Sequence, residues 1–150
     1  MVVNLVQESH LNRAFLYQQM KVDRLARRVY VLENAICKKH LRIHAQEENI
    51  EFSRKLDLAA EARADKKVSN CFARQKEDIV QGVQYVQSWA PRDELSKELA
   101  RNAITRNHAE FYILGYRKEI AQLKGELKVA QEVLRKQQAR LEKLKALSPR

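Results

Sequence analysis

Cys37, His40 and His44 are the residues whose types and spacing come nearest to a metal site in this chain. The spacing C-x2-H-x3-H places them on one side of a helix, where thiolate and imidazole groups could bind Zn²⁺. A structural zinc site, however, uses four ligands supplied by a turn and a helix, and no fourth ligand lies nearby. We therefore expect no metal. The three residues stay a weak candidate beside the simpler interpretation, a solvated or partner-facing stripe.

No other pattern in the sequence predicts catalysis. Cys37 and Cys71 are the only cysteines, and a nucleophilic cysteine would need a histidine and an orienting group in a cleft. With 3 glycines and 2 prolines the chain has few residues for the loops that build clefts. We expect a protein that is not an enzyme and that holds no cofactor. The cysteine usage is typical of a reducing compartment.

Basic side chains gather at the C-terminal end, where seven Lys and Arg stand against two Glu from Lys128 onward. Four of them are expected on the side of a helix opposite its apolar residues: Lys128, Arg135, Lys136 and Lys143. This stripe spans several turns, whereas the stabilising effect of basic residues on the helix dipole fades within one turn. We therefore expect the stripe to contact an acidic surface or phosphates.

The whole chain shares this basic bias, with 29 Lys and Arg against 19 Asp and Glu in 150 residues, a formal charge of +10. Such a balance favours acidic partners: nucleic acid, an anionic membrane surface, or a protein polymer with an acidic face. The many acidic residues also indicate solvated helix faces with intrahelical ion pairs. No run of ~20 apolar residues predicts a membrane span, and the first residues do not resemble a secretory signal.

The elements that must carry these residues are helices, because Glu, Lys, Arg, Gln, Ala and Leu are frequent and glycine is rare. Two companion rows that recur every seven residues predict a coiled-coil helix over residues 91–150. Asn102 and Arg106 stand in this C-terminal seam where leucine is expected, so they either fix the register or mark a level at which the helix leaves its partner. The rows are Leu95, Asn102, Ala109, Tyr116, Leu123, Ala130, Gln137 and Leu144, and Leu99, Arg106, Ile113, Ile120, Leu127, Leu134 and Leu141.

A second heptad pattern, the N-terminal seam, begins near Ser9. Its a row is Phe15, Val22, Val29, Ile36, Ile43 and Ile50, and its d row is Gln18, Leu25, Leu32, Lys39, Gln46 and Ser53. β-Branched residues at a with Leu at d favour parallel pairing in isolated coiled coils, and Arg28 with Glu33 and Arg42 with Glu47 form attractive g–e pairs. The register is expected to fail between Asp57 and Asn70, which leaves open a solvated helix, a register slip or a break. The predicted domains are therefore a helical region over 1–90, interrupted around 57–70 in some of these alternatives, and the helix over 91–150.

The stretch SWAPRDEL, residues 88–95, predicts a short turn near residues 87–92. Ser88 is a suitable cap, Pro91 suits the first turn of a helix, and acidic residues follow. We expect an all-α fold of two long helices of coiled-coil type, arranged as an antiparallel hairpin or as an extended rod. In a hairpin that turns at Trp89, the first 20 or so residues would overhang.

Together these patterns predict a non-catalytic structural coiled-coil protein built into a large assembly. We favour a cytoplasmic, cytoskeletal lattice of the microtubule or axoneme type, as in a cilium or flagellum, with the basic face on an acidic surface such as that of tubulin. The alternatives are an RNA-binding helical component of a ribosome-like particle and a homodimeric coiled-coil adaptor. The residues predicted to form a partner-binding seam are Val22, Leu25, Val29, Leu32, Ile36, Ile113, Tyr116, Ile120, Leu123, Leu127, Leu134 and Leu141.

Overall fold

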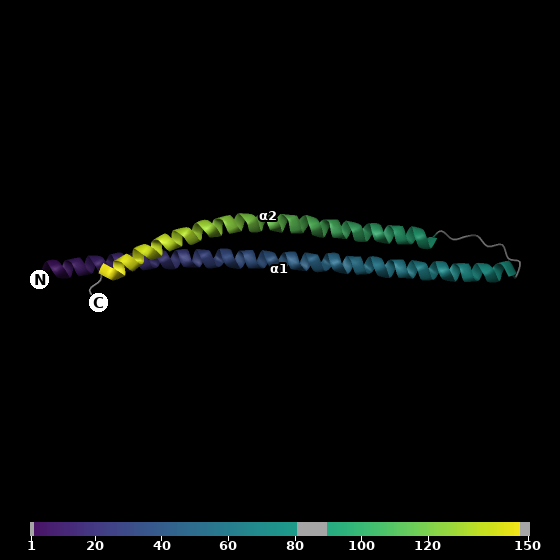
Figure 1. Cartoon of the computed structure of the whole chain (residues 1–150), viewed down its shortest axis with the longest axis horizontal. Coiled ribbons are helices and arrows are strands. Elements are labelled where there is room, and N and C mark those ends of the chain that lie inside the picture. The colour runs from purple at the N-terminus through teal and green to yellow at the C-terminus, as the bar shows by residue number, and fades with distance from the viewer. Residues whose placement is uncertain (1, 81–89, 148–150) are drawn as a thin grey trace. The chain divides into compact units, whose positions relative to one another are not determined.

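The computed structural model describes residues 2–80 and 90–147, and within them the side chains of residues 7–70 and 93–147. Both described segments are helical: α1 spans Val2–Val80 and α2 spans Ala90–Leu147. The two helices pack against each other, so the all-α helical hairpin is confirmed (Figure 1). Neither described helix is apolar enough over a sufficient length to cross a membrane.

The chain forms two compact units, each made from one stretch of α1 and one stretch of α2. Unit 1 comprises Met1–Leu41 with Tyr116–Arg150, and unit 2 comprises Arg42–Gly115. In unit 2 the paired residues lie 27 positions apart for Lys67 and Glu94, and 53 positions apart for Ser53 and Arg106. This increase along the helices shows antiparallel packing in unit 2.

Unit 1 is antiparallel as well. Gln18 contacts Gln137, and Lys39, further along α1, contacts Glu119, which lies earlier on α2. The expectation that the first 20 or so residues overhang is therefore wrong, since Gln18 is buried against α2. The expectation compares the number of residues before and after Trp89. The actual register instead depends on which side chains of α1 and α2 pair across the interface.

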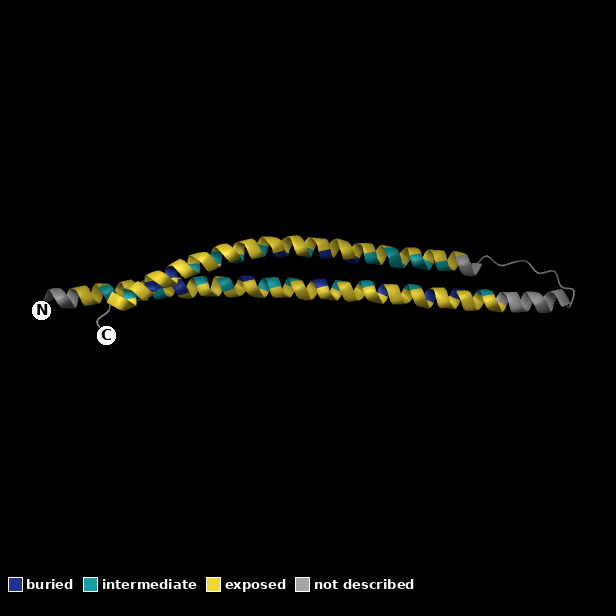
Figure 2. Ribbon diagram, viewed as in Figure 1, coloured by how far each residue is buried: buried dark blue, intermediate teal, exposed yellow. Residues whose placement is uncertain are grey.

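The cores of both units lie between the helices, where the heptad rows meet (Figure 2). Buried apolar residues of unit 1 include Val22 and Leu32 from α1 and Ile120 and Leu141 from α2. In unit 2 they are Ile43, Ala60, Ala64, Ala109 and Ile113. The seams thus bury their apolar rows against each other, as a 3.5-residue repeat requires.

The segment 57–70 is continuous helix, part of α1, without the break that the sequence left open. The register that is expected to fail there continues as far as Ala64, because Asp57 takes an a position and the buried Ala60 and Ala64 take the next d and a positions, whereas Lys67 at the following d position is exposed. Asp57 at a core position suggests a register failure in the sequence alone, because the sequence does not show that Asn102 and Arg106 of α2 bind its carboxylate.

The predicted turn near residues 87–92 falls largely outside the described residues, which resume at Ala90. Trp89 and the cap at Ser88 therefore lie outside them. Because α2 begins at Ala90, Pro91 occupies its first turn, where the missing N–H has no intrahelical partner to lose. Asp93 lies in the same first turn, as the sequence predicts, and favours the helix dipole.

Candidate functional site

The predicted partner-binding seam lies between α1 and α2. Five of its residues are buried: Val22, Leu32, Ile113, Ile120 and Leu141. The other seven are half-buried: Leu25, Val29, Ile36, Tyr116, Leu123, Leu127 and Leu134. Within each unit these side chains cover one another, so the surfaces left for a partner are the outer flanks of the helices.

The weak metal candidate does not gather into a site. Cys37, His40 and His44 are all exposed, and the Nε2 atom of His44 lies 3.0 Å from a carboxylate oxygen of Glu48. Among the residues that the structure describes, no three His, Cys, Asp or Glu side chains are placed to hold a metal ion together.

Unit 2 contains a polar layer of four residues inside its interface: Ser53, Asp57, Asn102 and Arg106. The Asn102 amide donates a hydrogen bond of 2.8 Å to Asp57, and Arg106 donates to the other oxygen of the same carboxylate. The Ser53 hydroxyl donates a hydrogen bond of 3.0 Å to the main-chain carbonyl oxygen of Asn102 and accepts one of 3.3 Å from Arg106. Each polar member of one helix is therefore matched by polar members of the other.

The polar layer changes the acidity of its carboxyl group. Hydrogen bonding from Asn102 holds the pKa of Asp57 below its ordinary value; burial opposes this, and the hydrogen bond and positive charge of Arg106 add to it. The layer is satisfied throughout, and no buried side-chain nitrogen or oxygen of the described residues lacks a partner. Such a layer suits register selection, because any shift would separate the charges in a partly dry interface.

Sequence reasoning singled out Asn102 and Arg106 and separately placed a register failure at Asp57. The structure shows that these are one feature. The available signal was only that each seam contains a polar intrusion. Spacing from the predicted turn does not pair them, because Asp57 lies 32 residues before Trp89 and Asn102 lies 13 residues after it.

Unit 1 has smaller polar layers of its own. The Gln18 amide donates bonds of 2.9 Å to the carbonyl oxygen and to the side-chain oxygen of Gln137, and both side chains are buried. Further along α1, Lys39 pairs with Glu119 and places its ammonium group 5.4 Å from the centre of the Tyr116 ring. These contacts explain how Lys39 and Gln18 occupy core positions.

The outer flanks of α1 are sorted by charge. From Ala14 to Asn70 the c and g positions hold seven exposed Lys and Arg and no acid: Lys21, Arg24, Arg28, Lys38, Arg42, Arg63 and Lys66. The b and e positions on the opposite flank hold six exposed acids and one Arg: Asp23, Glu33, Glu47, Glu51, Glu61, Asp65 and Arg54. We call these the basic side and the acidic side of α1.

In unit 1 the basic side of α1 is joined by basic residues of α2. The ion pair of Arg28 with Glu126, 3.8 Å long, shows which flank of α2 lies beside the basic side. Arg140 lies two heptads beyond Glu126 and so follows on the same flank, with Lys136 and Lys143 one turn to either side. All three are exposed.

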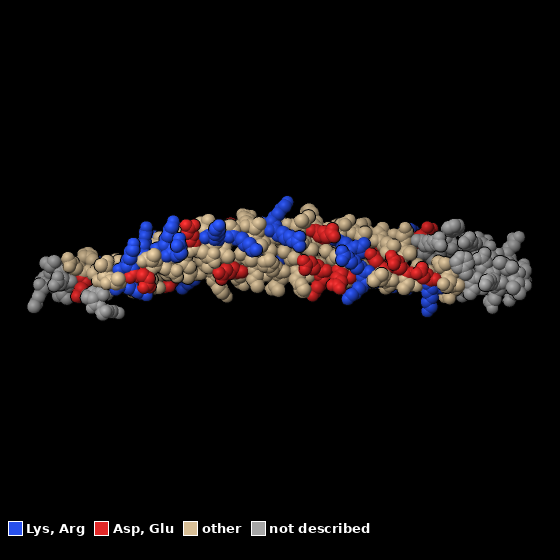
Figure 3. Space-filling view, viewed as in Figure 1, with Lys and Arg blue, Asp and Glu red and all other residues tan. Residues whose placement is uncertain are grey.

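We define the basic face of unit 1 as Lys21, Arg24, Arg28, Lys136, Arg140 and Lys143. Lys and Arg side chains gather where the last turns of α2 lie beside α1 (Figure 3). Two of the six have exposed acidic partners at 3.8 and 3.9 Å, Glu126 and Glu132, and such pairs are weak in water.

Of the four predicted stripe residues, Lys136 and Lys143 belong to this basic face. Lys128 and Arg135 are exposed as well, but they lie further round α2, on the flank away from the basic side of α1.

Comparisons of the chain with protein-family models, curated proteins and solved structures find no match.

Proposed function

We propose that this chain is a non-catalytic structural protein of a large assembly and that the basic face of unit 1 binds an acidic protein surface. A cytoskeletal lattice of the microtubule or axoneme type is the assembly that this chemistry suits, because its walls are regular and acidic. Localisation in the cytoskeleton, including a cilium or flagellum, belongs to the same proposal.

The observation that carries this proposal is the composite origin of the basic face. Six exposed basic side chains from two helices share one flank of unit 1, whereas the acidic side of α1 contributes only Asp23 and Glu33 to the other flank of this unit. Charges sorted in this way produce a directed field, which speeds encounter with an acidic partner and orients it. The partner is expected on this flank because the apolar seams are already covered within each unit.

Co-sedimentation of the full chain with microtubules tests the proposal. Two reversals in the basic face, Lys136→Glu with Lys143→Glu, are expected to weaken binding about tenfold at about 50 mM salt and to matter less at about 500 mM salt. The α1 pair Lys21→Glu with Arg24→Glu should have the same effect, since the face is composite. The matched control, Lys55→Glu with Lys97→Glu, changes the same charge on exposed residues of unit 2.

Equal weakening by the control pair would mean that net charge alone matters, and unchanged binding of both basic-face variants would refute the proposal. A duplex RNA assayed in parallel covers the alternative of a ribosome-like particle. Tight RNA binding with a steep salt dependence, lost with the same four residues, would favour that alternative.

A further inference from the structure

Unit 2 also has flanks of opposite charge, and most of the charged residues on these flanks form no ion pair with another described residue. The residues of the basic side that lie in unit 2 are Arg42, Arg63 and Lys66. Of these three, Arg63 is paired with Glu98 at 2.6 Å, and the other two form no ion pair with a described residue. The residues of the acidic side that lie in unit 2 are Glu47, Glu51, Glu61 and Asp65, and none of these forms an ion pair with another described residue.

Each flank also has an apolar centre between its charges. On the basic side Phe52 is 62% exposed and Leu56 is 37% exposed, with Arg42 before them and Arg63 after them. On the acidic side a groove of about 490 Å³ opens, with Glu47 and Glu51 among its lining and Glu61 and Asp65 further along the helix. Its lining residues are Glu47, Ile50, Glu51, Arg54, Lys55 and Leu58.

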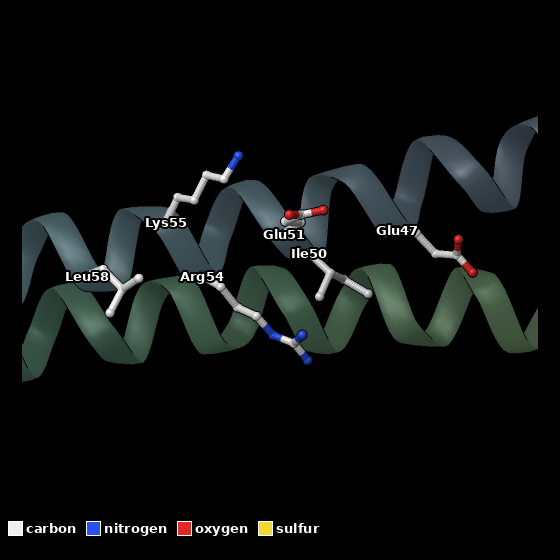
Figure 4. A pocket seen from close by; sticks show the side chains of 6 residues that line it. All are labelled: Glu47, Ile50, Glu51, Arg54, Lys55 and Leu58. Carbon is white, nitrogen blue, oxygen red and sulfur yellow. The ribbon is translucent and has the colours of Figure 1, made fainter.

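The groove has an apolar floor and a charged rim. The side chains of Ile50, Arg54 and Leu58 extend from α1 toward α2, whereas Lys55 points away (Figure 4). Leu58 is 67% exposed, so a sizeable apolar surface faces water there. Burying such a surface under an aromatic ring is favourable by roughly 25 cal/mol per Å² of apolar area.

The two flanks match at the same level of α1. The groove residues run from 47 to 58, so they surround the level of Phe52, which projects from the opposite flank. Suppose that a second copy lies beside the first in the same orientation, with its basic side against the acidic side of the first and with no shift along the helix axis. Phe52 of the second copy then lies over the groove of the first. The same placement brings Arg42 of the second copy toward Glu47 of the first, and Lys66 of the second toward Asp65 of the first.

The pair Arg42 and Glu47 cannot form inside one chain, because its members lie on opposite flanks of α1. In a parallel coiled coil, a g residue and the e residue five positions later pair across a shared a/d seam. The a and d rows of α1 are instead buried against α2, so Arg42 and Glu47 lie on opposite outer flanks, where each is open to a neighbouring copy.

We propose that unit 2 binds a second copy of this chain, side by side and parallel, with Phe52 of one copy in the groove of the next. The contact joins two different surfaces, so it leaves one basic side and one acidic side open at the ends. Further copies can then add in a row, as heterologous contacts allow. The contact uses none of the basic face of unit 1 and does not rest on the function proposed above.

Sedimentation velocity of the full chain at about 50 mM salt measures this association. Arg42→Glu alone and Glu47→Arg alone are each expected to weaken it about tenfold by like-charge repulsion. The double variant Arg42→Glu with Glu47→Arg should restore it, since the swapped charges attract again between copies. The control Lys97→Glu reverses an exposed charge on α2 and should leave it unchanged.

Phe52→Ala is expected to weaken association by about tenfold or more, the size typical of an aromatic anchor. The matched control is Phe111→Ala, which removes an aromatic ring that is 73% exposed on the outer side of α2. Circular dichroism of every variant confirms that the helices are intact, because all the substituted side chains are exposed.

Zero-length crosslinking of mixed ¹⁴N and ¹⁵N chains reports the orientation. A parallel, unshifted pair is expected to give crosslinks between Lys66 of one chain and Asp65 or Glu61 of the other. Crosslinks from Lys66 to Glu47 between chains would mean antiparallel docking and would overturn the proposal. So would a chain that stays monomeric at about 100 µM, or a charge swap that restores nothing.

Discussion

Unit 1 and unit 2 use the same two helices but hold them together differently. The core of unit 1 is made of large aliphatic residues such as Leu32, Ile120 and Leu141, with the neutral Gln18–Gln137 pair near one end. The core of unit 2 contains Ala60, Ala64 and Ala109, and its polar layer carries a full positive and a full negative charge.

The difference separates two tasks of a coiled-coil interface. Large apolar side chains stabilise the pair through burial, but a row of them tolerates sliding by a heptad. A charged layer adds little net stability but penalises every register other than the one in which its members meet. Unit 1 therefore has the larger aliphatic side chains in its buried set, and the polar layer of unit 2 is suited to selecting the alignment.

The largest effect is expected in the seam of unit 1. Leu127→Asp with Leu134→Asp places two carboxylates at half-buried positions, and each change should cost roughly 2–5 kcal/mol through lost burial and an unpaired polar group. Hydrogen exchange is expected to show lost protection on both helical stretches of unit 1, with more protection kept in unit 2.

The control Val129→Asp, at a position 63% exposed, should change the stability of unit 1 by less than about 0.5 kcal/mol. If the double variant kept native protection in unit 1, then its seam would not be closed by the chain itself. Equal loss in both units would mean that they unfold as one.

An intermediate effect is expected from the polar layer of unit 2. Asp57→Leu and Arg106→Leu singly should each lower the melting temperature, because each leaves a charged partner unpaired in the interface. Asp57→Leu with Arg106→Leu should recover much of that loss while allowing other registers, which crosslinking between the helices would detect.

The matched control in unit 1 is Gln18→Leu with Gln137→Leu. It is expected to raise stability without new registers, since both replaced side chains are uncharged and the Lys39–Glu119 pair of the same unit stays in place. A double Asp57 and Arg106 variant that keeps a single register would show that the alignment comes from elsewhere.

The smallest effect is a dependence of stability on pH. The folded state holds the pKa of Asp57 below its ordinary value of 3.8, so the unfolded chain binds the proton more readily. The contribution of this carboxylate is therefore fully present above about pH 5 and is lost as the pH falls through the folded pKa. Thermal unfolding of the wild type and Asp57→Asn, followed from neutral to acid pH, should show a gap that narrows below about pH 4.

Asp65→Asn is the control for this titration, since Asp65 is exposed and forms no ion pair with another described residue. A gap between wild type and Asp57→Asn that stayed constant down to about pH 2 would contradict the role assigned to this carboxylate.

Much of the fold could be predicted from local pattern. Helix-forming composition and the seven-residue spacing of Val22, Val29 and Ile36 identify the helices and their inner sides, because periodicity on a helix decides which side chains share a side. The pairing of the two seams could not be read in the same way. The a and d residues favour parallel partners, whereas the short turn predicted near residues 87–92 favours the antiparallel hairpin that the structure shows, and neither pattern decides which residues meet.

The candidate surfaces divide in the same manner. Lys136 and Lys143 could be placed on an outer side of α2 from spacing alone. Their association with Lys21 and Arg24 depends on which flank of α1 faces them, and the contact of Arg28 with Glu126 decides that. The sequence predicts a register failure at Asp57, because a carboxylate at a core position is costly unless partners on the other helix compensate it.

The amino-acid sequence by itself determined the helices, their apolar sides and the sorting of charge around α1, since these follow from residue type and from the 3.6-residue turn. Only the tertiary structure decided the register and the shared flanks. Those depend on which distant side chains meet, and the energy that selects them, such as the bond of Arg106 to Asp57, exists only when both helices are in place.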